Sequence, residues 1–294
     1  MNTTDQLIEL IGQSNKMQRK FLKESYNMID GSSKEELNNY LTFCMSNGLT
    51  LQYLADSYNL IVQDTLKEQV YFKKNGRYRY STYQEVAGRV YLNPDYMSKY
   101  MYGLGITSYL WPQHIEYKSF YEKHFPFGKK GNYLEIGPGH GVFFKYALDK
   151  ASFDEFVGVD ISPTSLEMTK SILADKLDSN IELIEADFLE FDSGDRYDAI
   201  VMGEVLEHVE NPSDFMNKIY SLANDDCFIF ITTCVNAPAI DHIQLFRYPS
   251  EIEQKFVEAN LKIKESKYIP YGNLTYEESM ERKLPVNVAY ILSR

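Results

Sequence analysis

Three glycines, Gly137, Gly139 and Gly141, follow directly on a short apolar run that spans residues 132–136. Glycine lets a chain turn sharply and lets a ligand come close to the backbone. The residues after the glycines, 142–149, have the apolar spacing of a helix. This order of strand, glycine loop and helix predicts the ligand-binding start of a parallel α/β fold.

The second half of the chain, from about residue 127, alternates short apolar runs with helical stretches, which is the pattern of a parallel sheet with crossover helices. The predicted strands span 132–136, 156–160, 181–186, 197–202 and 227–234. The predicted helices between them span 142–149, 165–176, 211–223 and 249–260. Two further runs, 262–269 and 286–292, predict a terminal hairpin.

Residues 1–125 have a different character and are predicted to form a helical cap that serves as a substrate domain, in front of a cofactor-binding domain at 126–294. The segment 71–121 holds eleven of the 24 tyrosines and the only tryptophan, Trp111. Aromatic rings with a polar tip bury area and still form hydrogen bonds, so they suit the wall of an organic pocket. Plain helix packing is the alternative for each single tyrosine.

The glycine spacing and a neighbouring acid indicate which ligand the loop takes. The loop has the spacing G-x-G-x-G, with Glu135 two positions before the first glycine. Dinucleotide-binding proteins tend to carry G-x-G-x-x-G, which seats a pyrophosphate on the helix N-terminus. A carboxylate beside the loop repels a pyrophosphate, whereas it suits the cationic amino-acid end of S-adenosylmethionine.

Two further acids end the next two predicted strands. Asp160, with Ile161 beside it, ends the second strand, where a carboxylate can accept hydrogen bonds from both ribose hydroxyls. Asp187 and Phe188 end the third strand, where an acid can bind the adenine amino group and a ring can pack on the base. A turn residue at Asp160 and a helix cap at Asp187 are the plain alternatives. Markers at three successive strand ends nevertheless favour a nucleoside site.

With these motifs, residues 127–294 resemble class I S-adenosylmethionine-dependent methyltransferases. The resemblance implies an α/β fold with a seven-stranded, mostly parallel, doubly wound sheet whose last strand is antiparallel. It implies S-adenosylmethionine as the cofactor and is nearly silent on the methyl acceptor. The residues assigned to the cofactor in this way are Glu135, Gly137, Gly139, Gly141, Asp160, Ile161, Asp187, Phe188 and Glu204.

A second cluster follows the fourth and fifth predicted strands. If the segment 203–208 opens a helix, then Glu204, Glu207 and His208 share one face, and His242 lies in the next loop at the same edge of the sheet. This E-x-x-E-H arrangement with a later histidine resembles the metal site of small-RNA 2′-O-methyltransferases, and a similar motif occurs in the ubiquinone-pathway O-methyltransferases.

The resemblance implies that all four residues bind a divalent ion such as Mg²⁺, Mn²⁺, Fe²⁺ or Zn²⁺, which would orient a substrate oxygen and lower its pKa. A structural Glu-His pair without a metal is the alternative. In that case His242 or His208 is the candidate general base, because imidazole titrates near neutral pH.

The charge and composition of the chain limit the kinds of partner that we expect it to bind. The formal net charge of −12 opposes binding to nucleic acid, whose affinity for proteins comes largely from neutralised phosphates. We expect no membrane partner, because no run of 18 apolar residues occurs. The N-terminus lacks the features of a signal peptide, so a cytoplasmic location is expected. The three cysteines are widely separated and suggest neither disulfides nor a thiolate zinc site. The sequence leaves a homodimer open.

The sequence therefore favours an O-methyltransferase that acts on a small organic acceptor, such as an intermediate of secondary metabolism. N-methylation is the second candidate and C-methylation the third. Two hypotheses from other functional classes are a nicotinamide-dependent oxidoreductase and a non-catalytic binding module with the same fold. The intact glycine loop and the two nucleoside acids count against the binding module.

Overall fold

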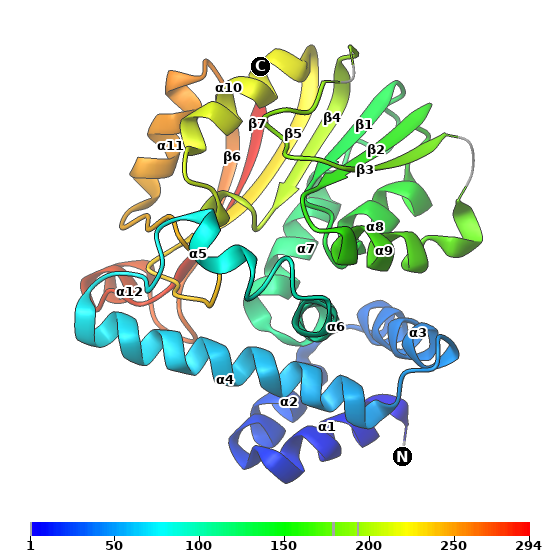
Figure 1. Cartoon of the computed structure of the whole chain (residues 1–294), viewed down its shortest axis with the longest axis vertical. Coiled ribbons are helices and arrows are strands. Elements are labelled where there is room, and N and C mark those ends of the chain that lie inside the picture. The colour runs from blue at the N-terminus through cyan, green and yellow to red at the C-terminus, as the bar shows by residue number, and fades with distance from the viewer. Residues whose placement is uncertain (1, 178–179, 193) are drawn as a thin grey trace.

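The apolar runs of the second half form a seven-stranded sheet in the order β3-β2-β1-β4-β5-β7-β6 (Figure 1). The computed structural model describes residues 2–177, 180–192 and 194–294; residue 1 of the predicted cap lies outside these ranges. Strands β1 to β5 are parallel, and β7 runs antiparallel to both of its neighbours, which confirms the predicted sheet and hairpin. The strands are β1 (Asn132–Ile136), β2 (Glu155–Asp160), β3 (Ile181–Glu185), β4 (Tyr197–Gly203), β5 (Ala223–Val235), β6 (Lys262–Ile269) and β7 (Val286–Ser293).

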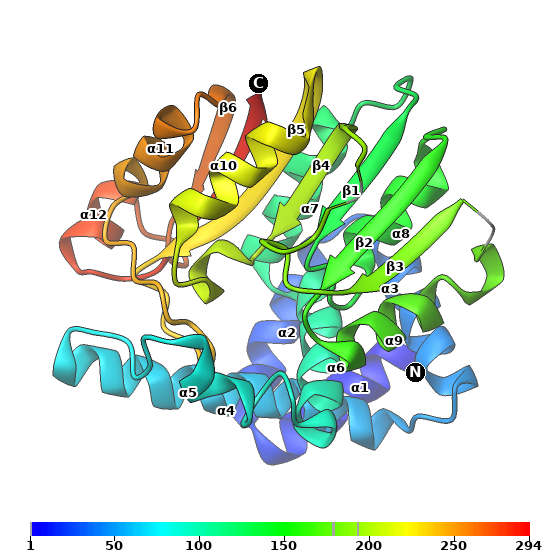
Figure 2. The same cartoon turned by 45° about the horizontal axis from the view of Figure 1, so that its top comes forward.

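Helices cover both faces of the sheet (Figures 1 and 2). On one face α10 and α11 bury apolar side chains against β4 and β5, among them Phe215 and Ile252 against Ile229. On the other face α7 and α8 contribute Tyr121 and Phe144 to a second core. The helical elements of this half are α7 (Pro112–His124), α8 (Val142–Lys150), α9 (Pro163–Ile172), η1 (Ala174–Lys176), η2 (Leu206–His208), α10 (Pro212–Leu222), α11 (Pro249–Glu258) and α12 (Tyr276–Glu281).

The predicted elements are present, and they differ from the structure at some ends. The helix predicted at 165–176 begins at Pro163, because Ser162 caps it by accepting the Ser165 N–H at 3.3 Å, and it is interrupted after Ile172. Strand β5 begins at residue 223, four residues before the predicted start, and its pairing with β4 is irregular there. Helix α12 was not predicted. It is short and begins with a Thr275–Glu278 capping box.

The first half is helical, as predicted. Helix α6 lies at its centre and packs against the long helix α4, and the same core takes in Val142 and Met168 from the sheet half. A Cβ atom on Gly103 of α6 would lie 2.6 Å from the Ser57 carbonyl oxygen, so glycine lets α6 and α4 approach closely. The helices here are α1 (Thr3–Ser14), α2 (Lys16–Met28), α3 (Gly31–Ser46), α4 (Leu51–Asn75), α5 (Tyr83–Ala87) and α6 (Pro94–Leu110).

Helix α7 joins the two halves. It follows α6 directly and packs its aromatic side chains on the sheet, so the predicted boundary after residue 125 falls just beyond a helix that contacts both parts. That boundary stays a prediction. None of the helices in the described ranges combines the length and the apolar character that crossing a bilayer requires.

Replacing Phe230 tests the junction between α7 and the sheet. This ring is fully buried in β5, with its centroid 4.9 Å from that of Tyr121 and 5.6 Å from that of Phe143. We expect Phe230→Ala to lower the free energy of unfolding by about 3 to 5 kcal/mol, measured by denaturant titration, because it leaves a cavity in an aromatic cluster. Val257→Ala on α11, where the side chain is 68% exposed, is the control. A loss below about 1 kcal/mol for Phe230→Ala would contradict this packing.

Candidate active site

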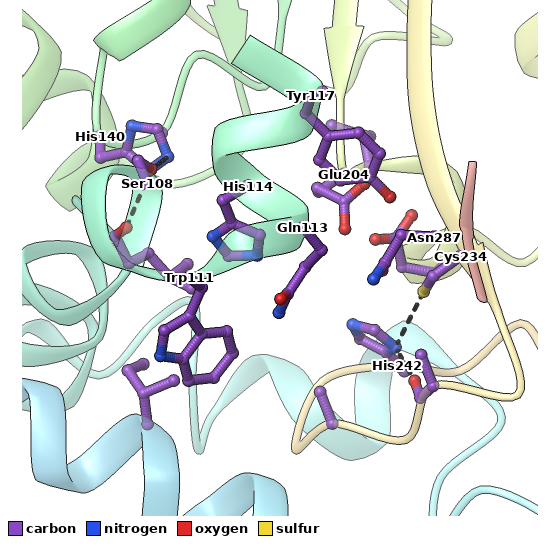
Figure 3. A pocket seen from close by; sticks show the side chains of 18 of the residues that line it. Ser108, Trp111, Gln113, His114, Tyr117, His140, Glu204, Cys234, His242 and Asn287 are labelled. Atoms are coloured by element: carbon purple, nitrogen blue, oxygen red, sulfur yellow. Dashed lines mark hydrogen bonds between the residues drawn. The ribbon is translucent and has the colours of Figure 1, made fainter. Parts of the chain in front are cut away.

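A cleft of about 2060 Å³ opens where the carboxyl ends of the parallel strands meet the helical cap. Its lining includes eight of the nine residues predicted for the cofactor; the exception is Gly141. The cleft is also lined by Glu207, His208 and His242, the other predicted site residues. The structure thus brings both predicted clusters to one cavity, part of which is drawn in Figure 3.

The glycine loop has the backbone conformation that its residues favour. Gly137, Gly139 and Gly141 have φ angles of 66°, 54° and 75°, in the left-handed region where other residues are strained. A Cβ atom on Gly137 would lie 2.6 Å from Cγ2 of Val205, so this position also has no room for a side chain. At Gly139 a Cβ atom would meet nothing closer than Sδ of Met101 at 3.4 Å, and the loop is open to the cleft there.

Two acids beside this loop, Glu135 and Asp160, form no ion pair with a cation in the described part of the chain, and they are buried and half-buried, respectively. Glu135 is 2% exposed and accepts a hydrogen bond from the Tyr133 hydroxyl. Asp160 accepts hydrogen bonds from the N–H groups of Gly139 at 3.3 Å and Ser162 at 2.8 Å. Burial raises the pKa of Glu135 to about 8 and the pKa of Asp160 to about 6. Such a site favours a ligand that brings positive charge or hydroxyl donors.

The residues after β3 are split between the surface and the core. Asp187 is exposed, and its carboxylate accepts the Leu189 N–H at 2.9 Å, so it stabilises a turn as well as lining the cleft. Phe188 is 4% exposed and packs on Phe215 with 5.2 Å between ring centroids. Ile161 is 37% exposed and offers more apolar surface to the cleft than Phe188 does.

The segment 203–208 does not open the α-helix on which the shared face of Glu204, Glu207 and His208 depended. Glu204 has a φ of 54°, which a right-handed helix excludes, and only a single 3₁₀ turn forms, over Leu206–His208. The backbone N–H of Glu204 is instead 3.1 Å from the Thr232 hydroxyl oxygen, to which it donates. A left-handed conformation at a residue other than glycine is uncommon and recurs at functional sites.

The carboxyl groups of Glu204 and Glu207 are nevertheless close enough to influence each other. Glu207 is fully buried, and one of its oxygens accepts a hydrogen bond from the Thr233 hydroxyl at 2.7 Å. The other oxygen, like Oε1 of Glu204, has no hydrogen-bond partner among the described residues. Burial raises the pKa of Glu207 to about 7, while burial and the neighbouring Glu207 raise the pKa of Glu204 well above its ordinary value.

The two predicted histidines face each other, with ring centroids 4.8 Å apart and planes nearly perpendicular. Nδ1 of His242 lies 2.6 Å from the Ala237 carbonyl oxygen, and Nδ1 of His208 lies 3.0 Å from the Asp241 carbonyl oxygen. Because a carbonyl only accepts, both Nδ1 atoms donate. The Tyr91 hydroxyl also lies 3.0 Å from Nδ1 of His208, and Nε2 of His208 lies 4.0 Å from Oε1 of Glu207. Burial lowers the pKa of His242 to about 3, so its ring is neutral.

Sequence reasoning missed two residues of this cluster, Asp241 and Cys234. Side-chain ligand atoms of Glu207, Cys234 and His242 lie within 4.8 Å of one another, and so do those of His208, Asp241 and His242. Among the described residues Glu204 belongs to neither group. The position of Asp241 beside His242 in the sequence was the available signal for it. Cys234 gave none, because its separation from the other cysteines suggested only a core residue.

The aromatic segment contributes in part to the cleft. Asp241 accepts hydrogen bonds from the hydroxyls of two cap residues, Tyr100 at 3.0 Å and Tyr91 at 3.4 Å. The other tyrosines of this segment, apart from two more at the cleft, pack elsewhere, which was the plain alternative. The segment's aromatic rings that line the cleft are Tyr83, Tyr91, Tyr100, Trp111, His114 and Tyr117, three of which are labelled in Figure 3.

Known proteins with similar sequences are methyltransferases. A family model described as a methyltransferase domain matches residues 113–263, which is half of the chain. The mitochondrial ubiquinone biosynthesis O-methyltransferase of Dictyostelium discoideum is 25% identical over 186 residues, covering 53% of this chain and 57% of that protein. The (S)-tetrahydroprotoberberine N-methyltransferase of Eschscholzia californica is 30% identical over 99 residues, covering 33% of this chain and 28% of that protein. The chain thus spans between about a quarter and just over half the length of these relatives.

Solved structures of other proteins share this fold. The mitomycin 7-O-methyltransferase matches with a TM-score of 0.57 and 13% identity, covering 83% of this chain and 70% of that one. A putative methyltransferase in complex with a Haloferax volcanii methyltransferase activator matches with a TM-score of 0.51 and 14% identity, covering 69% of this chain and 97% of that one. The oxidoreductase and the non-catalytic module are set aside by the family match. The chain belongs to the methyltransferase domain family and has the fold of the class I S-adenosylmethionine-dependent methyltransferases.

Proposed function

We propose that this enzyme methylates a hydroxyl group of a small organic molecule. The observation that carries the proposal is the pair of half-buried imidazoles, His208 and His242, which are each fixed through Nδ1 to a backbone carbonyl in a cleft walled by aromatic rings. A hydroxyl is a poor nucleophile until its proton is removed, and a neutral imidazole is suited to remove it. A small molecule fits better than nucleic acid, because the net charge is −12. A cytoplasmic location and a homodimer stay predictions.

We assign the cofactor to the glycine loop and the acids around it. When bound, S-adenosylmethionine supplies a methyl group on a positively charged sulfur. Glu135 would bind the ammonium end and Asp160 the ribose hydroxyls, while Asp187 would accept from the adenine amino group. Ile161 and Phe188 would pack against the base. The fit rests on a buried and a half-buried carboxylate, Glu135 and Asp160, that have no cation partner in the described residues, and on a loop that is open to the cleft at Gly139.

We assign the proton-accepting role to His242, with His208 as the second candidate. The pKa of His242, lowered by burial to about 3, keeps the ring neutral at physiological pH, and its Nδ1 hydrogen bond to Ala237 fixes the ring. A base with so low a pKa accepts a proton better once the nearby carboxylates of Asp241 and Glu207 stabilise the imidazolium. Positioning the acceptor oxygen beside the methyl group supplies the larger part of catalysis.

A divalent metal ion held by Glu204, Glu207, His208 and His242 is the proposed alternative to a free histidine base, because a metal-bound Nε2 no longer accepts a proton. The residues fit such an ion, because both histidines donate through Nδ1 to backbone carbonyls and leave Nε2 for a metal, and one Glu207 oxygen has no partner among the described residues. Bound there, the ion would orient the acceptor oxygen and lower its pKa. Asp241 and Cys234 are alternative ligands close to His242.

Methylation of an amine is a second candidate, and the charge of the cleft favours it. The cleft is lined by ten acidic side chains and by two lysines, Lys118 and Lys267. Lys118 pairs with Glu36 and Glu122, and Lys267 pairs with Glu116. A protonated amine would be attracted to such a surface, and the same histidines could deprotonate it. The similarity to the (S)-tetrahydroprotoberberine N-methyltransferase of Eschscholzia californica is consistent with this alternative.

Replacing Asp160 tests the cofactor site. We expect Asp160→Ala to weaken binding of S-adenosylhomocysteine at least about 100-fold in calorimetry, because two hydrogen bonds to a carboxylate are lost. Asp160→Asn separates the role of charge from that of the turn, since its carbonyl oxygen can still accept from Ser162. Asp214→Ala, at the first turn of α10, is the control. Unchanged binding in Asp160→Ala would refute the assignment.

Replacing Glu135 tests the buried acid through pH. Burial raises its pKa from 4.5 to about 8 in the folded protein, because the neutral acid is easier to bury. The contribution of Glu135 to the free energy of unfolding is therefore most favourable below about pH 4.5 and is lost as the pH rises through 8. Each unit of this difference is worth about 1.4 kcal/mol. We expect Glu135→Gln to flatten the fall in melting temperature of the cofactor-free protein between pH 5 and pH 9. Exposed Glu155→Gln is the control, and parallel curves for wild type and Glu135→Gln would contradict the burial of this charge.

Kinetics test the chemistry. With tritiated S-adenosylmethionine and a panel of catechols, phenols and amines, we expect His242→Ala to lower kcat about 10²- to 10⁴-fold while S-adenosylhomocysteine still binds. Mass and NMR analysis of the product distinguishes an O-methyl from an N-methyl group. Only amine products would replace the proposed function by the second candidate.

The same assay tests the metal. If an ion is bound, elemental analysis of the purified enzyme finds it, and both a chelator and the double variant Glu207→Ala, His208→Ala abolish activity. Activity indifferent to the chelator and to the double variant would end the metal proposal and leave His242 as the sole base.

A further inference from the structure

The cleft continues well beyond the space that a cofactor and a small acceptor need. Its volume of about 2060 Å³ exceeds the roughly 300 to 1,000 Å³ of ordinary ligand pockets. Seven of the fifteen large apolar side chains that are exposed in the described residues line this one cavity. Four of the seven lie in the cap, on α2 and α4: Met17, Phe21, Met28 and Leu66. Exposed apolar side chains that gather in one cavity indicate a ligand.

These side chains recur four or seven residues apart along their helices, and Glu24 lines the cleft between Phe21 and Met28. Met17, Phe21 and Met28 share one face of α2, and Val62 and Leu66 share one face of α4. We refer to these five residues as the α2–α4 groove. The exposed fractions are 84% for Met17, 74% for Met28 and 53% for Leu66, so no other described segment covers these three, whereas Val62 is buried in the cap core.

The helices of the groove are held in place by polar contacts behind it. The Ser25 hydroxyl of α2 donates to the Leu110 carbonyl oxygen at the end of α6, at 2.5 Å. The Tyr58 hydroxyl of α4 donates to Gln18 of α2 at 2.5 Å, and it accepts from the Trp111 indole N–H at 2.9 Å. Trp111 therefore lies where the groove meets the rest of the cleft.

From Trp111 the lining runs on to the proposed chemistry. Figure 3 shows Trp111, then Gln113 and His114, and beyond them Glu204 and His242 around the same space. The amide of Gln113 points into this space and has no hydrogen bond in the described part of the chain. The apolar groove and the reacting groups are two ends of one cavity.

The charge of the lining restricts what can occupy it. The acidic side chains outnumber the two lysines, and each lysine is paired with acids. A carboxylate or phosphate on the ligand would be repelled along the whole path.

We propose that the α2–α4 groove binds a hydrocarbon arm of the methyl acceptor, which carries no negative charge and presents its hydroxyl near His242. This inference rests on the proposed function for the position of the hydroxyl. The acceptor is then an elongated, amphipathic molecule, and the cap selects it by its apolar arm.

The only tryptophan gives a direct readout of the groove, because a bromine atom in contact with Trp111 quenches its fluorescence. The full chain, saturated with S-adenosylhomocysteine, is titrated with 12-bromododecan-1-ol, with 4-bromobutan-1-ol and with 12-bromododecanoate. We expect saturable quenching by the long alcohol, with binding at least about 100-fold tighter than for the short one, because each buried methylene adds up to about fourfold. The anionic carboxylate should bind at least about tenfold more weakly than the long alcohol.

Matched variants on one helix assign the binding to the groove. We expect Leu66→Glu to weaken binding of the long alcohol at least about tenfold. Val70 lies one turn further along α4, is 70% exposed and does not line the cleft. Val70→Glu should therefore leave the binding of the long alcohol within twofold of wild type. Met17→Glu on α2 serves as a second variant in case Leu66→Glu does not fold. Equal binding in wild type, Leu66→Glu and Met17→Glu would overturn the proposal, as would binding that is independent of chain length.

Two parallel measurements keep this test separate from that of the proposed function. Methyl transfer to unsubstituted catechol reports the chemistry without an arm. If catechol is not methylated but the long alcohol still binds, the hydroxyl acceptor of the proposed function is rejected and the groove proposal stands. If catechol is methylated but no bromoalcohol quenches Trp111, the groove proposal is rejected. Size-exclusion chromatography is the second measurement. A dimer that Leu66→Glu dissociates, with quenching unchanged, assigns the groove to a second copy of the chain and overturns the proposal.

Discussion

Glu207 holds the two loops of the active site together. Its backbone carbonyl oxygen accepts hydrogen bonds from the N–H groups of Ile243 at 3.0 Å and Gln244 at 2.9 Å, which lie in the loop after β5. Its side chain accepts from Thr233 of β5. The loop after β4 is thereby fixed to the loop after β5, and the two imidazoles meet. A fully buried carboxyl group costs free energy unless it is paired or protonated. The hydrogen bonds around Glu207 offset that cost.

The parts of the fold that the sequence predicted are those set by local pattern. The glycine loop, the strand ends at Asp160 and Asp187, and the terminal hairpin each follow from apolar period and turn residues within a few positions. Helix α12 escaped prediction because it is only six residues long, with one buried side chain, Ser279. The early start of β5 escaped because Asp225 and Asp226 are exposed and polar, which hid the strand.

The arrangement of the active site depended on contacts that no local pattern contains. The left-handed backbone at Glu204 is held by Thr232, a residue on another strand, and it replaces the predicted helix by a single turn. The part played by Asp241 depends on Tyr91 and Tyr100, which lie about 140 to 150 residues away in the chain. The sequence identified the candidate reactive residues, whereas only the structure identified the residues that form hydrogen bonds with them.

Tyr91 and Tyr100 connect the cap to the groups proposed to react. Both belong to the cap half, and both bind the carboxylate of Asp241, whose backbone carbonyl in turn orients His208. The orientation of His208 therefore depends on the cap as well as on the sheet. The same two tyrosines line the cleft, so one set of side chains both shapes the wall around the acceptor and holds a group proposed to react with it.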